Sequence, residues 1–413
     1  MTPEFSVNGE RLRHDLDSLS QVGRQPDHGI YRMAFSDGDM EGRDWFRRRV
    51  EESGLAFHQD GAANIYARLD NGTGEACVLT GSHLDTVPGA GHLDGALGVV
   101  CALEALRVLH EKNVALQRPV EAVAFSDEEG RFGGLFGSQA VAGLVTPEYI
   151  HNASDLDGMT LVAAMAERGL DANVALHAQR PGGQIHAYVE LHIEQGPVLD
   201  SNAKRIGIVD AITGLFKWEI TLIGTANHAG TTPMSMRQDA FQGLAEFAGQ
   251  LQQVLAEFGS PQSTATIGRV ELKPGAANVI PGRAVFSLDV RDTDTEILES
   301  LADALRSSLS AIARRRDLMF EFSILSTVAP VQCDKQIIRA IEESVDVFGL
   351  NAIHLHSGAA HDAQIIASVA PAGMIFVPSK EGRSHSSAEW TAWEDIETGA
   401  NVLLNTLRRL ATQ

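Results

Sequence analysis

Hydrophobic residues follow two alternating patterns over most of the chain. Short, nearly continuous apolar runs occur at 76–82, 119–125 and 188–193, whereas residues 95–112 carry apolar positions at helical spacing. Continuous apolar runs are typical of strands buried on both faces, as in a parallel sheet that helices cover on both sides. The pattern therefore predicts an α/β fold built on a mixed, largely parallel sheet.

The stretch from about 207 to 326 follows a different order. It predicts a strand at 216–224, an amphipathic helix at 237–258, strands in TATIGRVEL and AVFSLDVRD, a helix near 294–315 and a strand at 319–326. This β-α-β-β-α-β order is the ferredoxin-like pattern. The alternation of strands and helices seen before residue 207 then resumes with HLHSG, GMIFVPS and a C-terminal helix from about 394. We therefore expect a catalytic domain of residues 1–208 and 328–413, interrupted by an inserted ferredoxin-like α+β domain of residues 209–327.

Length and composition support this division and exclude several partners. A chain of 413 residues exceeds one ordinary core, and 44% hydrophobic with 21% charged residues is a globular composition. The formal charge of −21 argues against nucleic acid and anionic membranes as partners. The N-terminus predicts an amphipathic helix rather than a signal peptide, and no segment has 18 uninterrupted apolar residues. We expect a cytoplasmic protein with no membrane partner.

The three cysteines lack any pairing pattern, and Cys77 and Cys101 are expected to be buried free thiols.

Candidate chemistry begins where the first apolar run ends. The segment GSHLDTVPGAGHLDGALG places His83 at the end of a strand, with Asp85 two residues on and Asp94 before a helix. The Asp85 carboxylate can accept the second ring N–H of a metal-bound imidazole and so fix its tautomer. Asp94 is open to two interpretations, as an N-cap of the helix or as a carboxylate that bridges two metals.

The next strands deliver further groups to their C-terminal ends. DEEG places Glu128 and Glu129 side by side, and neighbouring carboxylates repel unless a cation or a proton lies between them. His192 lies on the strand of ELHIEQG, and His385 lies in the Gly/Ser-rich segment GRSHSSAEW. In an open α/β sheet, ligands bind at this edge. A hydrolase with two metals needs such groups for separate tasks, ligation and proton transfer.

Nine motifs taken together identify a family resemblance. GSHLDTV, HLDGALG, DEEG, ELHIEQGPVL, NHAGTTPM, NVIPG, DVRD, SGAAHDA and SHSSAEW resemble, in this order, the hydantoinase/carbamoylase branch of the zinc-dependent M20 amidohydrolases. That branch contains N-carbamoyl-L-amino acid hydrolases, allantoate amidohydrolases and β-ureidopropionases. The resemblance covers residues from about 60 to 400.

The resemblance implies a centre with two divalent ions, of zinc or of manganese, cobalt or nickel. Asp94 would bridge the ions, with His83 and His192 completing one site and Glu129 and His385 completing the other. It further implies that Glu128 is the general acid/base and that Asp85 orients His83.

The inserted domain is implied to act as a lid and as a dimerisation domain. His228 in NHAG resembles the histidine that reaches the active site of the partner subunit to polarise the scissile carbonyl. Asn278 and Arg291 resemble ligands of the substrate carboxylate, with Gln195 near them. A guanidinium suits a planar carboxylate, which it can bind with two parallel hydrogen bonds. The expected partners are therefore a ureido substrate that bears a carboxylate and a second copy of the chain.

The implied reaction is hydrolysis of an N-carbamoyl-L-amino acid to the amino acid, CO2 and ammonia. Allantoate and β-ureidopropionate remain alternative substrates, and Trp390 in SHSSAEW favours the carbamoylases. A non-catalytic binding protein on the same scaffold is the alternative from another class. Two departures from the family pattern stand out: Gly130 is followed directly by Arg131, and SGAAHDA has Ala360 where a glycine is usual. They leave open the geometry of the loop after Glu129 and the backbone near His361.

Overall fold

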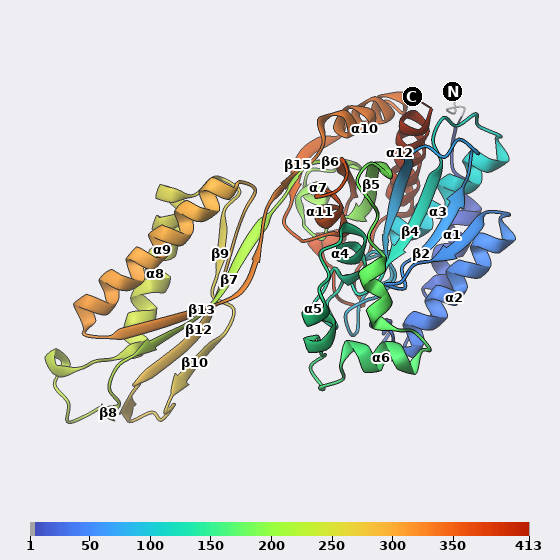
Figure 1. Ribbon diagram of the computed structural model, residues 1–413. Helices are drawn as coiled ribbons and strands as arrows, with labels where there is room; N and C mark the ends of the chain where they lie inside the picture. Colours follow the sequence, from blue (N-terminus) through green and yellow to red (C-terminus); the bar gives the residue numbers. More distant parts are fainter. Residues whose placement is uncertain (1–4, 413) are drawn as a thin grey trace. The chain divides into compact units, whose positions relative to one another are not determined.

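The computed structural model describes residues 5–412, and it divides into two compact units. One unit contains the residues up to Asp210 and from Cys333 onward, and the other comprises Ala211–Gln332. The boundaries expected from the sequence, at 208/209 and 327/328, fall within the strands β6 (Gly207–Ile212) and β13 (Met319–Val328). Figure 1 shows both units, with labels on many of their helices and strands.

The first unit is built on one mixed sheet. The strands of this sheet lie in the order β1 (Ala56–Gln59), β2 (Ile65–Leu69), β4 (Val120–Phe125), β3 (Cys77–His83), β5 (Ile185–Ile193), β16 (Ala372–Val377), β6 and β14 (Val331–Gln332), with β15 (Ile353–Ser357) beside β6. The last residues of β6 and the whole of β14 belong to the ends of the second unit. The pairs β4–β3, β3–β5 and β5–β16 are parallel, whereas the pairs β1–β2, β2–β4, β16–β6 and β6–β14 are antiparallel. The prediction of a mixed, largely parallel sheet is confirmed, with the parallel strands at its centre.

Helices cover both faces of this sheet because its central strands are apolar on both sides. The helices and 3-10 turns of this unit are α1 (Gly9–Leu19), α2 (Asp37–Glu52), α3 (Ala96–Glu111), α4 (Phe136–Ala142), α5 (Pro147–Asn152), α6 (Leu161–Glu167), η1 (Ala172–His177), α7 (Val198–Ser201), α10 (Lys335–Val347), α11 (Asp362–Ile366), η3 (Lys380–Gly382) and α12 (Trp393–Ala411). The helices α3 and α12 pack on the face that carries Val78, Ala122 and Val189. Alternate residues, among them Tyr188, point to the other face, where α4 and α11 contact the sheet.

The second unit has the predicted ferredoxin-like order. Its elements are β7 (Gly214–Ile223), β8 (Asn227–His228), η2 (Met234–Met236), α8 (Ala240–Phe258), β9 (Thr264–Thr266), β10 (Val270–Lys273), β11 (Val279–Ile280), β12 (Arg283–Asp292), α9 (Thr295–Arg316) and β13. The sheet order is β10-β12-β7-β13, with β9 also beside β12, and all these pairs are antiparallel. The helices α8 and α9 pack on each other and on the sheet. Asp239 and Asp294 cap these helices by accepting from two backbone N–H groups each.

One strand of this unit differs from the prediction. TATIGRVEL is not a single strand, because β9 pairs with Asp289–Arg291 while β10 pairs with Arg283–Phe286. The interruption contains Gly268, and the next N–H, of Arg269, is donated to the hydroxyl of Ser287 at 3.0 Å instead of to a backbone carbonyl. A glycine inside a strand often marks such a break in pairing.

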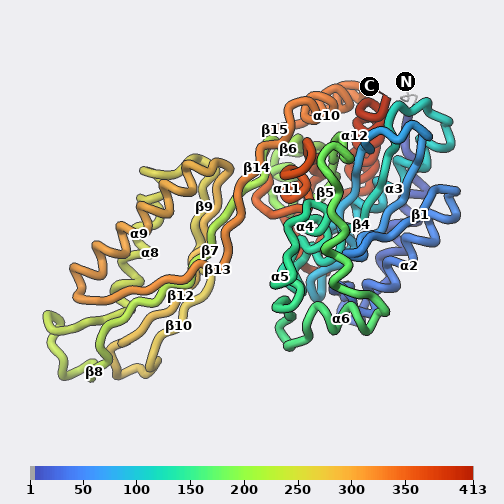
Figure 2. Tube along the Cα trace, viewed as in Figure 1, coloured from blue at the N-terminus to red at the C-terminus, as the bar shows by residue number. Residues whose placement is uncertain are grey.

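The exit and the entry of the second unit lie side by side. β14 pairs with β6, and the partners in this antiparallel ladder are Val331 with Ile212 and Gln332 with Ala211. Figure 2 lets the reader follow the chain as it leaves along β6 and returns along β14. The insertion therefore begins and ends at neighbouring positions of one sheet.

Several further expectations can be compared with the structure. Helix α1 confirms the predicted N-terminal amphipathic helix from Gly9 onward, and residues 1–4 lie outside the described residues. Cys77 and Cys101 are buried and unpaired, as predicted, and Cys333 is as well. No helix within residues 5–412 is long and apolar enough to cross a membrane.

Candidate metal centre

The central parallel strands bring the candidate residues to one edge of the sheet. β3 ends at His83, β4 leads directly into Ser126–Glu129, and β5 carries His192 one residue before its end. In the register, His83 is opposite Phe125, and His192 is opposite Phe376 of β16. Both histidines therefore lie on the face of the sheet opposite to the one that carries Val189, at its carboxyl edge.

Asp94 occupies the turn between β3 and α3. It does not cap the helix, because the N-cap position is Gly95 and no side chain accepts a hydrogen bond there. The capping interpretation of Asp94 is therefore wrong. Gly95 has φ +62°, and a β carbon at this position would lie 2.4 Å from atoms of the His83 ring. Only glycine allows this left-handed turn to pass so close to an imidazole.

Two buried imidazoles present the same nitrogen to Asp94. The Nδ1 atoms of His83 and His192 lie 2.9 Å from the backbone carbonyl oxygens of Asp85 and Ile193. Because a carbonyl only accepts, each Nδ1 carries the hydrogen, and Nε2 is left as the ligand atom. These Nε2 atoms lie 3.9 Å (His83) and 3.2 Å (His192) from Oδ1 of Asp94.

A second group forms on the other oxygen of Asp94. His385 Nε2 lies 3.3 Å from Asp94 Oδ2 and 3.5 Å from Oε2 of Glu129. Gln195 Nε2 and the hydroxyl of Ser384 each donate to the same Asp94 oxygen at 2.8 Å. His385 and Gln195 both have positive φ, of 53° and 56°. Such backbone strain persists where the surrounding structure fixes it, commonly at functional sites.

The two groups have the composition of metal sites. The potential ligand atoms of His83, Asp94 and His192 lie within 4.8 Å of one another, and so do those of Asp94, Glu129 and His385. Asp94 belongs to both groups, one oxygen to each. The structure therefore brings together all five residues that the sequence suggested as ligands.

Glu128 and Asp85 lie against the first group. Oε2 of Glu128 is 3.4 Å from Nε2 of His83. The Asp85 carboxylate does not hold the His83 ring as expected, since its nearest oxygen is 3.9 Å from Nδ1 and the backbone carbonyl takes that place. It accepts instead from the backbone N–H groups of Glu128 (3.3 Å) and Glu129 (3.1 Å). Asp85 thus positions the two acids as well as the ring.

Too many carboxylates meet here for all of them to be ionised without a counter-charge. Burial, with the charges of Glu129 and other acids, raises the pKa of Glu128 well above its ordinary value. Burial and Asp94 raise the pKa of Glu129 to about 8, and burial and Asp39 raise that of Asp85 to about 7. Burial alone would raise the pKa of Asp94 too, but hydrogen bonds from the nearby imidazoles hold it well below its usual range. Cations at this point would relieve the repulsion.

Two buried oxygens also lack partners within the protein. Oε1 of Glu129 and Oε1 of Gln195 accept no hydrogen bond among the described residues, although both are shielded from solvent. Buried acceptors are rarely left unpaired. Unpaired oxygens and Nε2 atoms around a shared carboxylate form a donor set that fits divalent metal ions such as zinc, manganese, cobalt or nickel.

Sequence reasoning missed Glu389, which holds the centre together. Its buried carboxylate accepts the backbone N–H groups of Leu93 (2.8 Å) and Asp94 (3.2 Å), and its other oxygen accepts from the Ser384 hydroxyl at 3.3 Å. It lies within the motif SHSSAEW, four residues after His385. An acid in a loop is usually a solvated residue, so its burial was the missing signal.

The remaining candidates lie in the second unit. His228 is exposed on β8, and its Nδ1 accepts from the N–H groups of Gly230 (3.0 Å) and Thr231 (3.2 Å), so that Nε2 carries the hydrogen. Asn278 lies beside it, since its carbonyl accepts from the N–H of Ala229 at 2.9 Å. These two residues are therefore neighbours.

Arg291 lies far from them within this unit. It is near the end of β12, where its Nε and Nη2 contact the Asp289 carboxylate at 2.8 and 3.2 Å. The strand β11, which pairs with His228, precedes the other end of β12. Arg283 and Arg291 are eight residues apart on β12, or about 27 Å at the rise of an antiparallel strand. Figure 1 shows β8 at one end of this sheet and β9, the partner of Arg291, toward the other.

Comparison with known proteins gives a consistent result. Residues 79–409 match the model of peptidase family M20/M25/M40. The chain is 39% identical over 409 residues to an N-carbamoyl-L-amino acid amidohydrolase of Geobacillus stearothermophilus, covering 98% of this chain and 99% of that protein. It is 38% identical to an allantoate amidohydrolase of Escherichia coli strain K12, covering 98% of each. The crystal structure of a hydantoinase/carbamoylase family amidase from Burkholderia multivorans superposes with a TM-score of 0.92 at 35% identity, over 100% of both chains.

Proposed function

The chain belongs to peptidase family M20/M25/M40, and on this premise we propose that it hydrolyses the ureido C–N bond of N-carbamoyl-L-amino acids. The observation that carries the proposal is the convergence of three imidazoles and two carboxylates, with Asp94 between two ligand groups. The products would be the amino acid, CO2 and ammonia. The predicted cytoplasmic location remains a prediction from the sequence.

Two divalent ions are part of this proposal. His83 and His192 would hold one ion and Glu129 and His385 the other, with Asp94 shared. When bound, such ions supply Lewis-acid polarisation of a carbonyl and make water more acidic. The donor set supports this assignment, because backbone carbonyls accept from Nδ1 of His83 and of His192 and leave each Nε2 directed toward Asp94, while Oε1 of Glu129 accepts no hydrogen bond among the described residues.

Glu128 is proposed as the general acid/base. Its side chain is only 10% exposed, its Oε2 lies 3.4 Å from Nε2 of His83, and no ligand group needs it. Its carboxylate would take the proton of the attacking water as the oxygen bonds to the ureido carbon. It would then give that proton to the leaving nitrogen as the C–N bond breaks. A carboxyl whose pKa is raised well above its ordinary value by burial and neighbouring acids suits this exchange.

His228 is proposed to stabilise the oxyanion, and Asn278 and Arg291 to bind the substrate carboxylate, with Gln195 beside the ions. The hydrogen on Nε2 of His228 makes it a donor to a developing negative charge. His228 pairs with β11, which precedes the Arg283 end of β12, whereas Arg291 lies about 27 Å from Arg283 along that strand. A small substrate cannot reach both residues of one chain. The two residues therefore serve different sites, which supports a homodimer in which His228 and Asn278 act on the partner's site.

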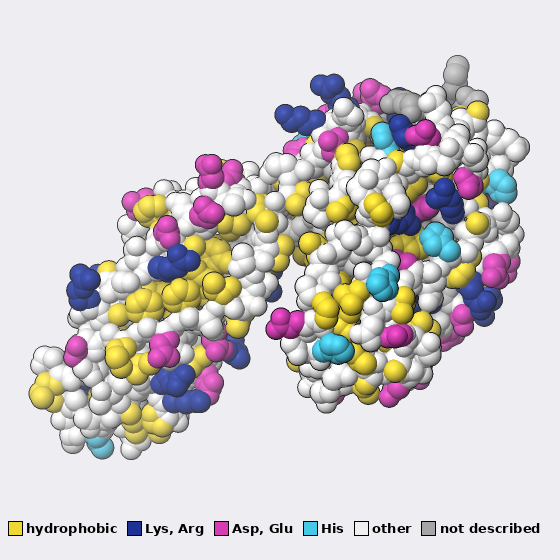
Figure 3. Space-filling model, viewed as in Figure 1, with side chains coloured by type: hydrophobic (Ala, Val, Ile, Leu, Met, Phe, Trp, Pro, Cys, Tyr) yellow, Lys and Arg dark blue, Asp and Glu magenta, His cyan; other side chains and the backbone are white. Residues whose placement is uncertain are grey.

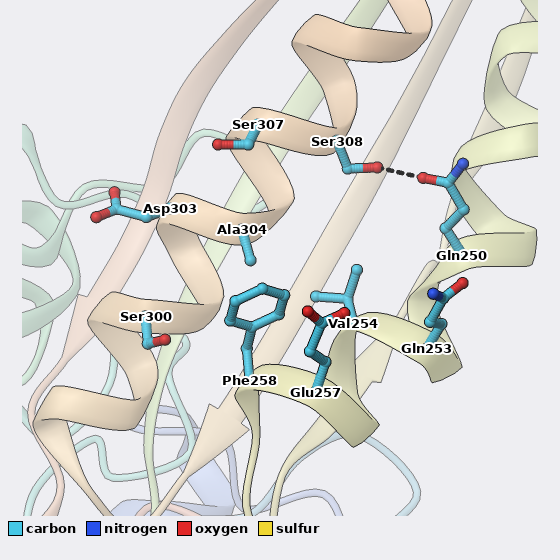
Figure 4. A pocket seen from close by; sticks show the side chains of 10 residues that line it. All are labelled: Gln250, Gln253, Val254, Glu257, Phe258, Ser300, Asp303, Ala304, Ser307 and Ser308. Carbon is cyan, nitrogen blue, oxygen red and sulfur yellow. Dashed lines mark hydrogen bonds between the residues drawn. The ribbon is translucent and has the colours of Figure 1, made fainter.

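The second unit offers a surface for such a dimer. β13 is at the end of the sheet order, and it carries the exposed apolar residues Met319, Ile324 and Leu325, which are 67%, 60% and 57% exposed. Figure 3 shows hydrophobic side chains gathered on one face of this unit. An edge strand with exposed apolar residues is a template for pairing with another chain.

Allantoate is the second candidate substrate, favoured by the similarity to the Escherichia coli enzyme. One experiment tests both candidates and the non-catalytic alternative. Protein loaded separately with zinc, manganese, cobalt or nickel is assayed for ammonia release from a panel of N-carbamoyl-L-amino acids, β-ureidopropionate and allantoate. The proposal expects turnover of N-carbamoyl-L-amino acids with the highest kcat/KM. Turnover of allantoate alone would contradict it, and no turnover with any metal would favour a binding protein.

A further inference from the structure

A cavity of about 380 Å³ opens beside the metal centre within the first unit. Glu129 forms part of its wall, so the cavity adjoins the second ligand group directly. Its apolar lining comes from three segments that are distant in sequence: Met33, Val87 with Pro88 after β3, and Leu156. The volume is within the range of small-molecule sites.

Leu156 is the most unusual residue of this lining. It is a large apolar side chain that is fully exposed, at the tip of the loop between α5 and α6. The loop is nevertheless held firmly, since Asp155 Oδ1 accepts from the N–H groups of Asp157 (3.0 Å) and Met159 (2.9 Å). An exposed leucine on a fixed loop costs hydration free energy that an apolar ligand would recover.

Arg131 joins the walls of the cavity. Its Nε and Nη2 contact Oδ2 of Asp155 at 3.1 and 3.0 Å, and its Nη1 donates to the carbonyl of Ala34 at 2.7 Å. The direct junction of Gly130 with Arg131, noted above as a departure from the family pattern, thus places an arginine where it ties the loop of Leu156 to the segment of Met33. Three of its N–H donors are engaged in this way, and the charge of Arg131 is paired with that of Asp155.

We infer that this cavity receives the side chain of the substrate and selects bulky apolar side chains, such as that of methionine. The inference rests on the proposed function. A molecule whose ureido group lies at the metal centre has the Glu129 side of the cavity next to it. The apolar lining favours a methionine side chain over the hydrogen of glycine, and the exposed carboxylate of Asp157 opposes an acidic one.

Three variants test the inference with N-carbamoyl-L-methionine, N-carbamoylglycine and N-carbamoyl-L-aspartate as substrates. Leu156→Ala removes an apolar wall and, because the side chain is exposed, should leave the fold intact. Val87→Phe fills the cavity. Leu144→Ala is the matched control, since Leu144 is 51% exposed in the same unit but does not line the cavity. Thermal unfolding of each variant checks the fold.

The unaltered protein should have its highest kcat/KM with the methionine substrate. The ratio of kcat/KM for the methionine and glycine substrates should fall roughly tenfold in Leu156→Ala and in Val87→Phe, and should not change in Leu144→Ala. Equal use of the three substrates, or an unchanged ratio in both cavity variants, would overturn this inference and leave the proposed function standing. Failure to hydrolyse any N-carbamoyl amino acid would overturn the proposed function, and this inference with it.

Discussion

Replacing Glu128 by glutamine separates proton transfer from metal binding. The change keeps the shape of the side chain and removes its ability to exchange a proton. The backbone N–H that Glu128 donates to Asp85 is retained. Burial and the charge of Glu129 already raise the pKa of Glu128, so a neutral amide relieves repulsion in the metal-free protein. We therefore expect Glu128→Gln to fold normally, with a Tm no lower than that of the unaltered protein.

The expected loss of activity follows from the proposed role. General acid–base assistance contributes about 10²- to 10⁴-fold to kcat, which corresponds to about 2.7–5.4 kcal/mol of transition-state free energy. The 3.4 Å contact of Oε2 with His83 is a contact beside a proposed ligand, so both metal ions should be retained. Turnover should fall by that factor while metal content stays at two ions per chain.

The assay combines two measurements on the same preparation. Ammonia release gives kcat, and elemental analysis gives the metal content. Glu129→Gln is the matched control, because it alters a proposed ligand and should lose metal together with activity. A Glu128→Gln variant that keeps more than about a tenth of the original kcat would refute the role of Glu128. Loss of metal from this variant would show that Glu128 is a ligand instead.

Three further predictions concern the metals, the dimer and the turn before α3. Hydrogen bonds and charges of the neighbouring acids raise the pKa of His385 and, against the effect of its burial, that of His192, each to about 9, so both carry a proton in the metal-free protein at neutral pH. Calorimetry in buffers of different ionisation enthalpy should show that zinc binding releases protons. The zinc affinity measured at several pH values should rise with pH, and a pH-independent affinity would contradict this prediction. His228→Ala and Arg291→Ala should each be nearly inactive, but mixing their subunits, with exchange confirmed by tags, should restore up to about a quarter of the activity; mixed dimers without activity would exclude the cross-subunit arrangement. Gly95→Ala should weaken metal binding sharply, because its β carbon would lie 2.4 Å from a ligand imidazole; an unchanged metal affinity would show that the turn tolerates a side chain.

Most of the fold was predictable because its signals are periodic. The apolar runs at 76–82, 119–125 and 188–193 became β3, β4 and β5, and the order of elements in the insertion gave its ferredoxin-like sheet. The prediction of one continuous strand over TATIGRVEL was wrong. Its apolar pattern continues through Gly268, and the pattern alone does not reveal that the N–H of Arg269 is donated to a side chain.

The part of the site that could be predicted consists of residues at or just after the ends of strands. His83, His192 and the acids after β4 follow strands that are parallel neighbours, so their meeting at one edge follows from topology. The task of Asp85 was not predictable in detail, since its carbonyl and its carboxylate are equally close in sequence to the ring. Glu389 depends on a contact between positions almost 300 residues apart, which no local pattern encodes.

Because Gln332 pairs with Ala211, the two ends of the insertion are held together, and the folding of the first unit does not depend on which residues lie between them. To the main sheet, the whole insertion is equivalent to the loop of a hairpin, and the entropy of closing a loop grows only slowly with its length. The first unit should therefore still fold when this segment is exchanged for another. Replacement of residues 213–330 by a short turn should accordingly yield a protein that retains the metal-binding residues and Gln195 and loses His228, Asn278 and Arg291. Exchange of this single contiguous stretch would change the groups proposed to act on the substrate carboxylate and the oxyanion, and it would leave the metal-binding residues in place.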